Sequence, residues 1–253
     1  MIPVALRLPL APPQAVGEVD VTLWENGGEI AVILAHGAGT DQRGVVLRMV
    51  AEGIARAGHT VLTFNFAYTQ AGRRIPDPHS RLLAAWRDVI TGARDRLGAS
   101  RRLVIGGRSM GGRMASMLAA EEDLCQGLLL LGYPLHAAGL PERLRTAHWP
   151  ALRVPTLFVQ GDRDALCPLD VLARERAALL ARAPTRVHVV AKADHSFGVR
   201  AHDGRTQGEV LDEVIHASTE WLDLMTSAGF QPGEEACDVG AQGSVLVDGG
   251  DEL

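Results

Sequence analysis

The stretch LVIGGRSMGGRMA, residues 103–115, places a serine between two pairs of glycines. Its apolar beginning predicts a buried strand, and the small and apolar residues after Ser109 predict a helix. Glycines on both sides of the serine indicate that the chain passes close to a neighbouring backbone. Such a junction has three interpretations: an ordinary helix cap, a phosphate-binding loop, or a serine nucleophile on a tight turn.

Short apolar runs alternate with amphipathic stretches of helical length along the rest of the chain. Buried strands are predicted at 29–36, 59–66, 101–107, 127–133, 154–161 and 185–191, and an antiparallel edge at 3–9 and 18–24. Helices are predicted at 44–58, 80–98, 109–122, 168–183 and 209–225. The alternation predicts an α/β fold, with a mostly parallel sheet between helices on both faces. We expect one domain over residues 1–226 and an acidic, glycine-rich, disordered tail over 227–253.

Composition excludes several classes of partner. The 253 residues are 47% hydrophobic with a net charge of -5, and no basic stripe offers a nucleic-acid surface. No apolar stretch approaches the roughly 18 residues that span a bilayer, and the N-terminal segment lacks the basic start of a signal peptide. The 3 cysteines have no paired spacing, which argues against a disulfide framework or a zinc site. We expect a cytoplasmic protein that acts on a small molecule.

The glycine clusters do not fit a nucleotide. A phosphate-binding loop that starts at Gly107 would need a lysine and a hydroxyl residue after Gly112, where the chain has Arg113 and Met114. The second cluster, HGAGTDQRG, has Gln42 where a dinucleotide site has its third glycine. We therefore expect no cofactor.

The choice between a cap and a nucleophile depends on the glycines. Serine is a good helix N-cap, but a cap does not require glycines in the first helical turn, where each costs roughly 1 kcal/mol relative to alanine. The pattern Gly-x-Ser-x-Gly at 107–111 is that of a nucleophile elbow, in which side chains at the glycine positions would collide with neighbouring backbone. This interpretation explains both glycines.

A serine nucleophile needs a histidine base and a carboxylate to orient it, and in this fold they follow in the order serine, acid, histidine. Asp164 follows the predicted strand at 154–161, and His195 follows the strand at 185–191. Both stand after the carboxyl ends of strands, where open α/β sheets carry their sites. We prefer Asp164 to Asp162, and we expect Asp194 to be a turn residue.

An oxyanion hole completes such a site. The backbone N–H of Met110, directly after the serine, is one expected donor, and the N–H of Ala38 in the HGAG segment is the other. Four residues are candidates for lining the substrate, with structural alternatives in packing or ion pairing: Gly37, Tyr68, Arg108 and His136.

Five motifs then carry a family resemblance: LAHGAGTD, GGRSMGGR, GYPLH, GDRD and DHSF. With them the chain resembles the α/β-hydrolase superfamily, in particular its dienelactone-hydrolase-like branch. Within that branch it is similar to a group of small bacterial hydrolases related to a vertebrate testis-expressed protein and to the hydrolase-like domain of a chromatin acetylation complex subunit. The resemblance covers about residues 20–226 and implies an eight-stranded sheet and the triad Ser109, Asp164 and His195. Dienelactone hydrolases have a cysteine nucleophile, so their substrate does not carry over.

The expected function is hydrolysis of small, soluble carboxylic esters through an acyl-enzyme, without a metal. The interval from Tyr133 to Arg153 has room for a loop and one short helix around 141–149, which predicts no large lid domain. Alternatives are a catalytically silent interaction module on the same fold, or a peptidase, thioesterase or acyltransferase that uses the same triad. The sequence leaves the oligomeric state open.

Overall fold

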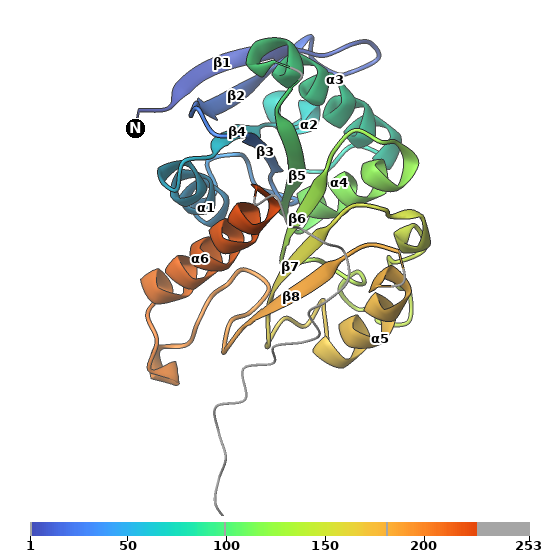
Figure 1. Ribbon diagram of the computed structural model, residues 1–253. Coiled ribbons are helices and arrows are strands. Elements are labelled where there is room, and N and C mark those ends of the chain that lie inside the picture. Colours follow the sequence, from blue (N-terminus) through green and yellow to red (C-terminus); the bar gives the residue numbers. More distant parts are fainter. Residues whose placement is uncertain (1, 99, 181, 227–253) are drawn as a thin grey trace, which may run out of the picture.

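A computed structural model describes residues 2–98, 100–180 and 182–226, so the tail expected at 227–253 lies outside the described residues. Eight strands form one sheet in the order β1-β2-β4-β3-β5-β6-β7-β8 (Figure 1). The strands are β1 Val4–Pro9, β2 Glu18–Trp24, β3 Ile30–Ala35, β4 Thr60–Phe64, β5 Arg102–Arg108, β6 Gly127–Leu131, β7 Thr156–Gly161 and β8 Thr185–Val190. The pairings β1–β2 and β2–β4 are antiparallel and the remaining five are parallel. The mostly parallel sheet with an antiparallel edge is confirmed.

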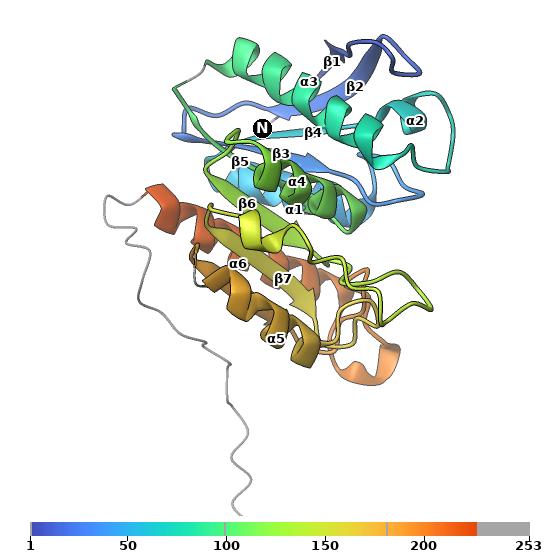
Figure 2. The same ribbon diagram turned by 90° about the vertical axis from the view of Figure 1, so that its right-hand side faces the viewer.

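Helices cover both faces of the sheet, as predicted (Figures 1 and 2). They are α1 Val45–Arg56, α2 Ala67–Gln70, α3 His79–Leu97, α4 Met110–Glu121, α5 Leu169–Leu180 and α6 Gln207–Thr226, with 3₁₀ turns η1 Trp149–Ala151 and η2 Ala201–Asp203. One face packs against α1 and α6, and the other against α3, α4 and α5. The short α2 was not predicted, because a single helical turn has no apolar periodicity to detect.

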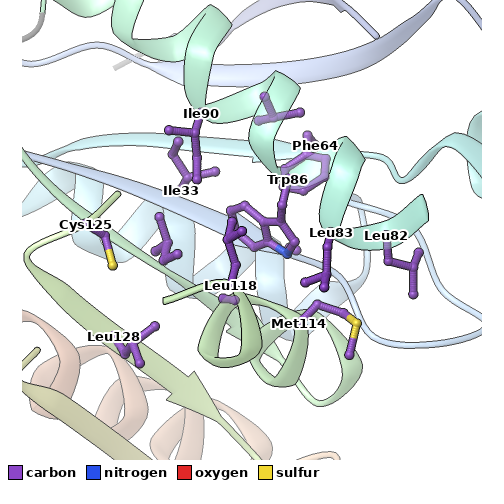
Figure 3. Packing of buried hydrophobic residues seen from close by; sticks show 14 of the residues in the cluster. Ile33, Phe64, Leu82, Leu83, Trp86, Ile90, Met114, Leu118, Cys125 and Leu128 are labelled. Carbon is purple, nitrogen blue, oxygen red and sulfur yellow. The ribbon is translucent and has the colours of Figure 1, made fainter. Parts of the chain in front are cut away.

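The core under α3 and α4 shows why these segments are helical. On α3 the buried positions Leu82, Leu83, Trp86 and Ile90 recur at helical spacing and face the sheet (Figure 3). The indole of Trp86 meets the ring of Phe64 edge-on, with ring centroids 4.9 Å apart. Burial of such a stripe holds α3 parallel to the sheet, so that its first residue reaches the carboxyl ends of the strands.

Glycines in β5 let the central strands approach each other. A Cβ on Gly106 would lie 1.9 Å from the carbonyl oxygen of Leu129, and one on Gly107 would lie 2.1 Å from that of Ala35. Gly107 also has a φ of 138°, a conformation that other residues rarely adopt. These positions fix the end of β5 between β3 and β6, and therefore fix where Ser109 emerges.

The connection from β6 to β7 is short. Within its residues 132–155, all of them described, the helix expected around 141–149 is replaced by turns, and the only helical segment is η1 at its end. Trp149 in η1 is buried against Tyr133 and Phe158, which ties the connection down to the sheet. The fold therefore carries no large lid between these strands.

No helix in the described part of the chain combines the length and the apolarity needed to span a membrane.

Candidate active site

Ser109 occupies a strained turn between β5 and α4. Its φ of 50° and ψ of -114° are unusual for a residue with a side chain. A Cβ on Gly111 would lie 2.3 Å from the carbonyl oxygen of Ala35, so no larger residue fits there without moving backbone. Although Ser109 holds the N-cap position of α4, its side chain makes no capping hydrogen bond. This observation argues against the plain helix cap.

The hydroxyl of Ser109 instead contacts His195. Its Oγ lies 2.9 Å from Nε2 of His195, and Nδ1 of the same ring lies 2.7 Å from Oδ2 of Asp164. The carboxylate accepts from Nδ1–H, which leaves Nε2 as the acceptor for the serine hydroxyl. The Asp164 side chain is completely buried, while that of His195 is 22% exposed. The fold thus brings the three residues into one hydrogen-bonded chain.

Two further groups hold the Asp164 carboxylate. The Gln160 side chain donates from Nε2 to Oδ2 at 2.5 Å, and the backbone N–H of Leu166 donates to Oδ1 at 2.8 Å. Gln160 is itself buried in β7 and accepts from the backbone N–H of Tyr133. The sequence reasoning missed Gln160, although a lone polar residue near the end of a buried apolar strand was a usable signal.

The neighbouring carboxylates behave differently from Asp164. Asp162 is exposed, and its side chain makes no hydrogen bond within the described ranges. Asp194 accepts from the backbone N–H groups of Ser196 and Gly198 at 2.7 and 2.8 Å, so it is a turn residue as predicted. The turn holds the loop that carries His195.

The segment after β3 lies against the serine turn. A Cβ on Gly37 would lie 3.5 Å from Cβ of Ser109, which shows how closely the two loops approach. Ala38 is exposed, and its N–H makes no hydrogen bond with any described residue. Met110 begins α4, where a helix leaves its first N–H groups unpaired. Both expected oxyanion donors are therefore free to bind a ligand.

His36 holds the segment after β3 in place through two hydrogen bonds. The backbone N–H of Phe66 donates to its Nε2 at 3.1 Å, and its Nδ1–H donates to the carbonyl of Gly37 at 2.8 Å. Burial lowers the pKa of His36 to about 4. The ring is therefore neutral at pH 7 and acts as a structural link between β3 and β4.

Arg108 bridges the loops on the other side of Ser109. Its guanidinium donates to Oγ of Ser196 at 2.7 Å and lies 2.9 Å from the Cβ position of Gly37. Burial lowers its pKa. It forms no ion pair with the described residues, although the charges of Asp164 and Asp194 counteract the effect of burial on its pKa. Its role toward a substrate stays a prediction.

Tyr68 and His136 are buried rather than open to a substrate. Tyr68 has no exposed surface, and its ring lies 5.9 Å from that of His36, which fits the packing alternative; its role toward a substrate stays a prediction. His136 is 5% exposed and donates from Nδ1–H to the carbonyl of Ala137. Its role toward a substrate stays a prediction.

A cavity of about 360 Å³ opens beside the segment after β3. None of Ser109, Asp164 and His195 borders this cavity. Its lining residues are Gly39, Thr40, Asp41, Gly44, Thr69, Gly72, Arg73 and Arg74. Among the described residues no three side chains of histidine, cysteine, aspartate or glutamate gather as a metal site would require.

Solved structures share this fold. An α/β serine hydrolase homologue from Coxiella burnetii superposes with a TM-score of 0.69 at 17% identity, covering 88% of this chain and 98% of that one. Dienelactone hydrolase from Anabaena variabilis superposes with a TM-score of 0.65 at 21% identity, covering 87% of this chain and 97% of that one. An α/β serine hydrolase without a lid from Xanthomonas campestris superposes with a TM-score of 0.64 at 19% identity, covering 87% of this chain and 94% of that one. A family model described as an alpha/beta hydrolase domain matches residues 28–223, and the chain therefore belongs to the α/β-hydrolase family.

Proposed function

We propose that this protein is a serine hydrolase that cleaves small, soluble carboxylic esters. The observation that carries the proposal is the hydrogen-bonded chain from Ser109 through His195 to Asp164, which starts at a strained turn. Strain of this kind costs of order 1–3 kcal/mol and persists at sites where it serves the chemistry.

The chain of hydrogen bonds assigns each residue a step. Ser109 Oγ attacks the ester carbonyl while Nε2 of His195 takes its proton, and the buried Asp164 stabilises the imidazolium that forms. His195 then returns the proton to the leaving alcohol, which leaves an acyl-enzyme. A water molecule, deprotonated by the same nitrogen, releases the acid and restores the serine.

The oxyanion of each tetrahedral intermediate needs two donors. We assign these roles to the N–H of Ala38, which makes no hydrogen bond with a described residue, and to that of Met110, the residue after Ser109. A donor of this type is worth roughly 2.7–4 kcal/mol in the transition state. The support that His36 gives to the Gly37 carbonyl fixes the first donor in place.

The surroundings of the serine favour short acyl chains. The β6–β7 connection forms no lid over the serine, and aromatic residues make up only 4% of the chain. Little apolar surface is therefore available to desolvate a long chain, at about 0.8 kcal/mol per buried CH₂. A series of 4-nitrophenyl esters should give the highest kcat/KM from acetate to butyrate and a lower value by octanoate. A steady increase up to dodecanoate would contradict this substrate class.

Labelling by a fluorophosphonate tests the nucleophile. The intact protein should gain one adduct, peptide mapping should place it on Ser109, and Ser109→Ala should abolish it. Ser80→Ala removes an exposed serine at the start of α3 and should label like the wild type. A folded wild-type protein that takes no adduct would favour the silent interaction module. A panel of esters, thioesters and amides then separates esterase from thioesterase and peptidase activity.

A further inference from the structure

Arg113 is a buried arginine without a negative partner. It lies in α4, four residues after Ser109, and is 8% exposed. Its guanidinium donates to Nε2 of His79 at 2.9 Å, and no described carboxylate lies within ion-pair distance of it. Buried charges are costly unless an opposite charge compensates them, so a position of this kind requires an explanation.

More positive charge surrounds Arg113. Arg145, from the β6–β7 connection, is half-buried, and its side chain makes no hydrogen bond or ion pair with any described residue. Burial and then the charge of Arg145 lower the pKa of Arg113, and burial followed by the same two arginines lowers the pKa of His79. Nε2 of His148 lies 2.8 Å from Oγ of Ser116 in the same helix, and burial together with the charge of Arg113 lowers the pKa of His148 to about 4.

The start of α3 adds positive charge to the region around Arg113. This 19-residue helix begins at His79, and its first turn has neither a side-chain cap nor an acidic residue. The backbone N–H groups of its first two residues, His79 and Ser80, have no hydrogen-bond partner among the described residues and lie at the positive end of the helix dipole. Figure 2 shows α3 and α4 side by side on one face of the sheet.

The carboxylates of this neighbourhood are engaged elsewhere. Asp77, just before α3, pairs with Arg73 at 2.8 Å. Glu175 of α5 accepts from Thr146 at 3.0 Å and from Arg174 at 3.3 Å. Neither forms an ion pair with Arg113, so no carboxylate among the described residues neutralises the cluster.

We infer that Arg113, Arg145 and the start of α3 bind an oxyanion, a phosphate or carboxylate group, between them. Guanidinium groups match such oxyanions in geometry, and a helix start supplies backbone donors. Because Nε2 of the neutral His79 accepts from Arg113, its Nδ1–H is a further donor. The ligand is either a free anion or the anionic end of a substrate. The site is separate from the proposed triad, since Ser109, His195 and Asp164 make none of these contacts.

Anion binding to the substrate-free protein tests the inference, whatever the fate of the proposed esterase activity. Inorganic phosphate and sulfate are titrated at constant ionic strength, by calorimetry and by thermal melting. Saturable binding is expected, with a Tm rise of about 3–6 °C at ten times the Kd. Arg145→Gln should weaken binding at least tenfold, and because Arg145 is half-buried this variant keeps the fold. Arg74→Gln is the matched control, since it removes an arginine that likewise has no side-chain partner among the described residues and lies beside the cavity near Gly39.

The inference is overturned if neither anion binds saturably, if Arg145→Gln binds as the wild type does, or if Arg74→Gln loses binding equally. Two esters then identify the source of the anion, 4-nitrophenyl hydrogen succinate and 4-nitrophenyl butyrate. If the site holds the substrate's carboxylate, phosphate competes with the succinate ester, and Arg145→Gln raises KM for that ester alone. If it holds a free anion, the two esters respond to phosphate and to the variant in the same way.

Discussion

Replacement of Asp164 by asparagine separates the proposed mechanism from a purely structural role of this carboxylate. In the wild type, Oδ1 accepts from the Leu166 N–H, and Oδ2 accepts from both Gln160 and His195. An asparagine keeps the volume and can keep the Leu166 bond through its oxygen. Its NH₂ group then occupies the Oδ2 position and faces His195 as a donor.

The asparagine would select the wrong tautomer of His195, the proposed base. When the amide donates to Nδ1 of His195, the ring carries its proton on Nε2 and cannot accept the proton of Ser109. A comparable change in other triads costs about 10⁴ in kcat, which corresponds to about 5.5 kcal/mol in the barrier. The same NH₂ also opposes the Gln160 donor, which adds a stability loss of about 1–3 kcal/mol.

The assay is kcat for 4-nitrophenyl butyrate, with thermal melting to verify the fold. Asp162→Asn is the matched control, because this exposed carboxylate stands two residues away and has no hydrogen-bond partner among the described residues. We expect the control to stay within twofold of the wild type. If folded Asp164→Asn retained kcat within tenfold, or if Asp162→Asn lost more, Asp164 would not orient the base.

The remaining predictions concern packing, pH and reactivity. Gly111→Ala should lower the Tm by about 5 °C or more, because its Cβ would meet a backbone carbonyl of β3 at 2.3 Å. Gly27→Ala is the control and should leave the Tm unchanged, because a Cβ there meets nothing within 4 Å. The folded-state pKa of His36, about 4, is below the unfolded value, so the unfolded chain binds the proton first and stability falls as the pH decreases from 7 toward 4. This loss of about 3 kcal/mol should be missing from the urea-unfolding pH profile of His36→Gln, and an unchanged profile would refute the assignment. Cys125 and Cys167 are buried with raised thiol pKa values, so iodoacetamide at pH 8 should alkylate them only after unfolding, as peptide mass mapping will show.

The fold was largely predictable because its signals are local and repeated. Each central strand is a short apolar run that is buried on both faces, such as β3 Ile30–Ala35, and the helices between them carry apolar stripes. The segment around 141–149 was predicted wrongly, because its conformation depends on the burial of Trp149 against Tyr133 and Phe158. Tertiary contacts of this kind leave no local pattern.

The serine, histidine and aspartate could be predicted to lie near one another because each directly follows a strand of a parallel sheet. Their supporting residues could not. Gln160 joins two loops through both ends of its amide, which requires the register of β6 and β7. The placement of Tyr68 beneath His36, and of Arg113 against the first residue of α3, depends on which way each helix turns its faces.

The same register explains how the strained serine is held. The strained turn at Ser109 persists because both of its ends are held: its N–H donates to the carbonyl of Leu131 at 2.9 Å, and its own carbonyl accepts from the backbone N–H of Arg113 at 3.0 Å. Gly107 and Gly111 bring this turn against the end of β3, where the proposed oxyanion segment begins. The proposed nucleophile and oxyanion donors are thus positioned by the packing of three adjacent strands. It follows that changes in β3 or β6 which shift their carbonyls will alter activity before they unfold the protein.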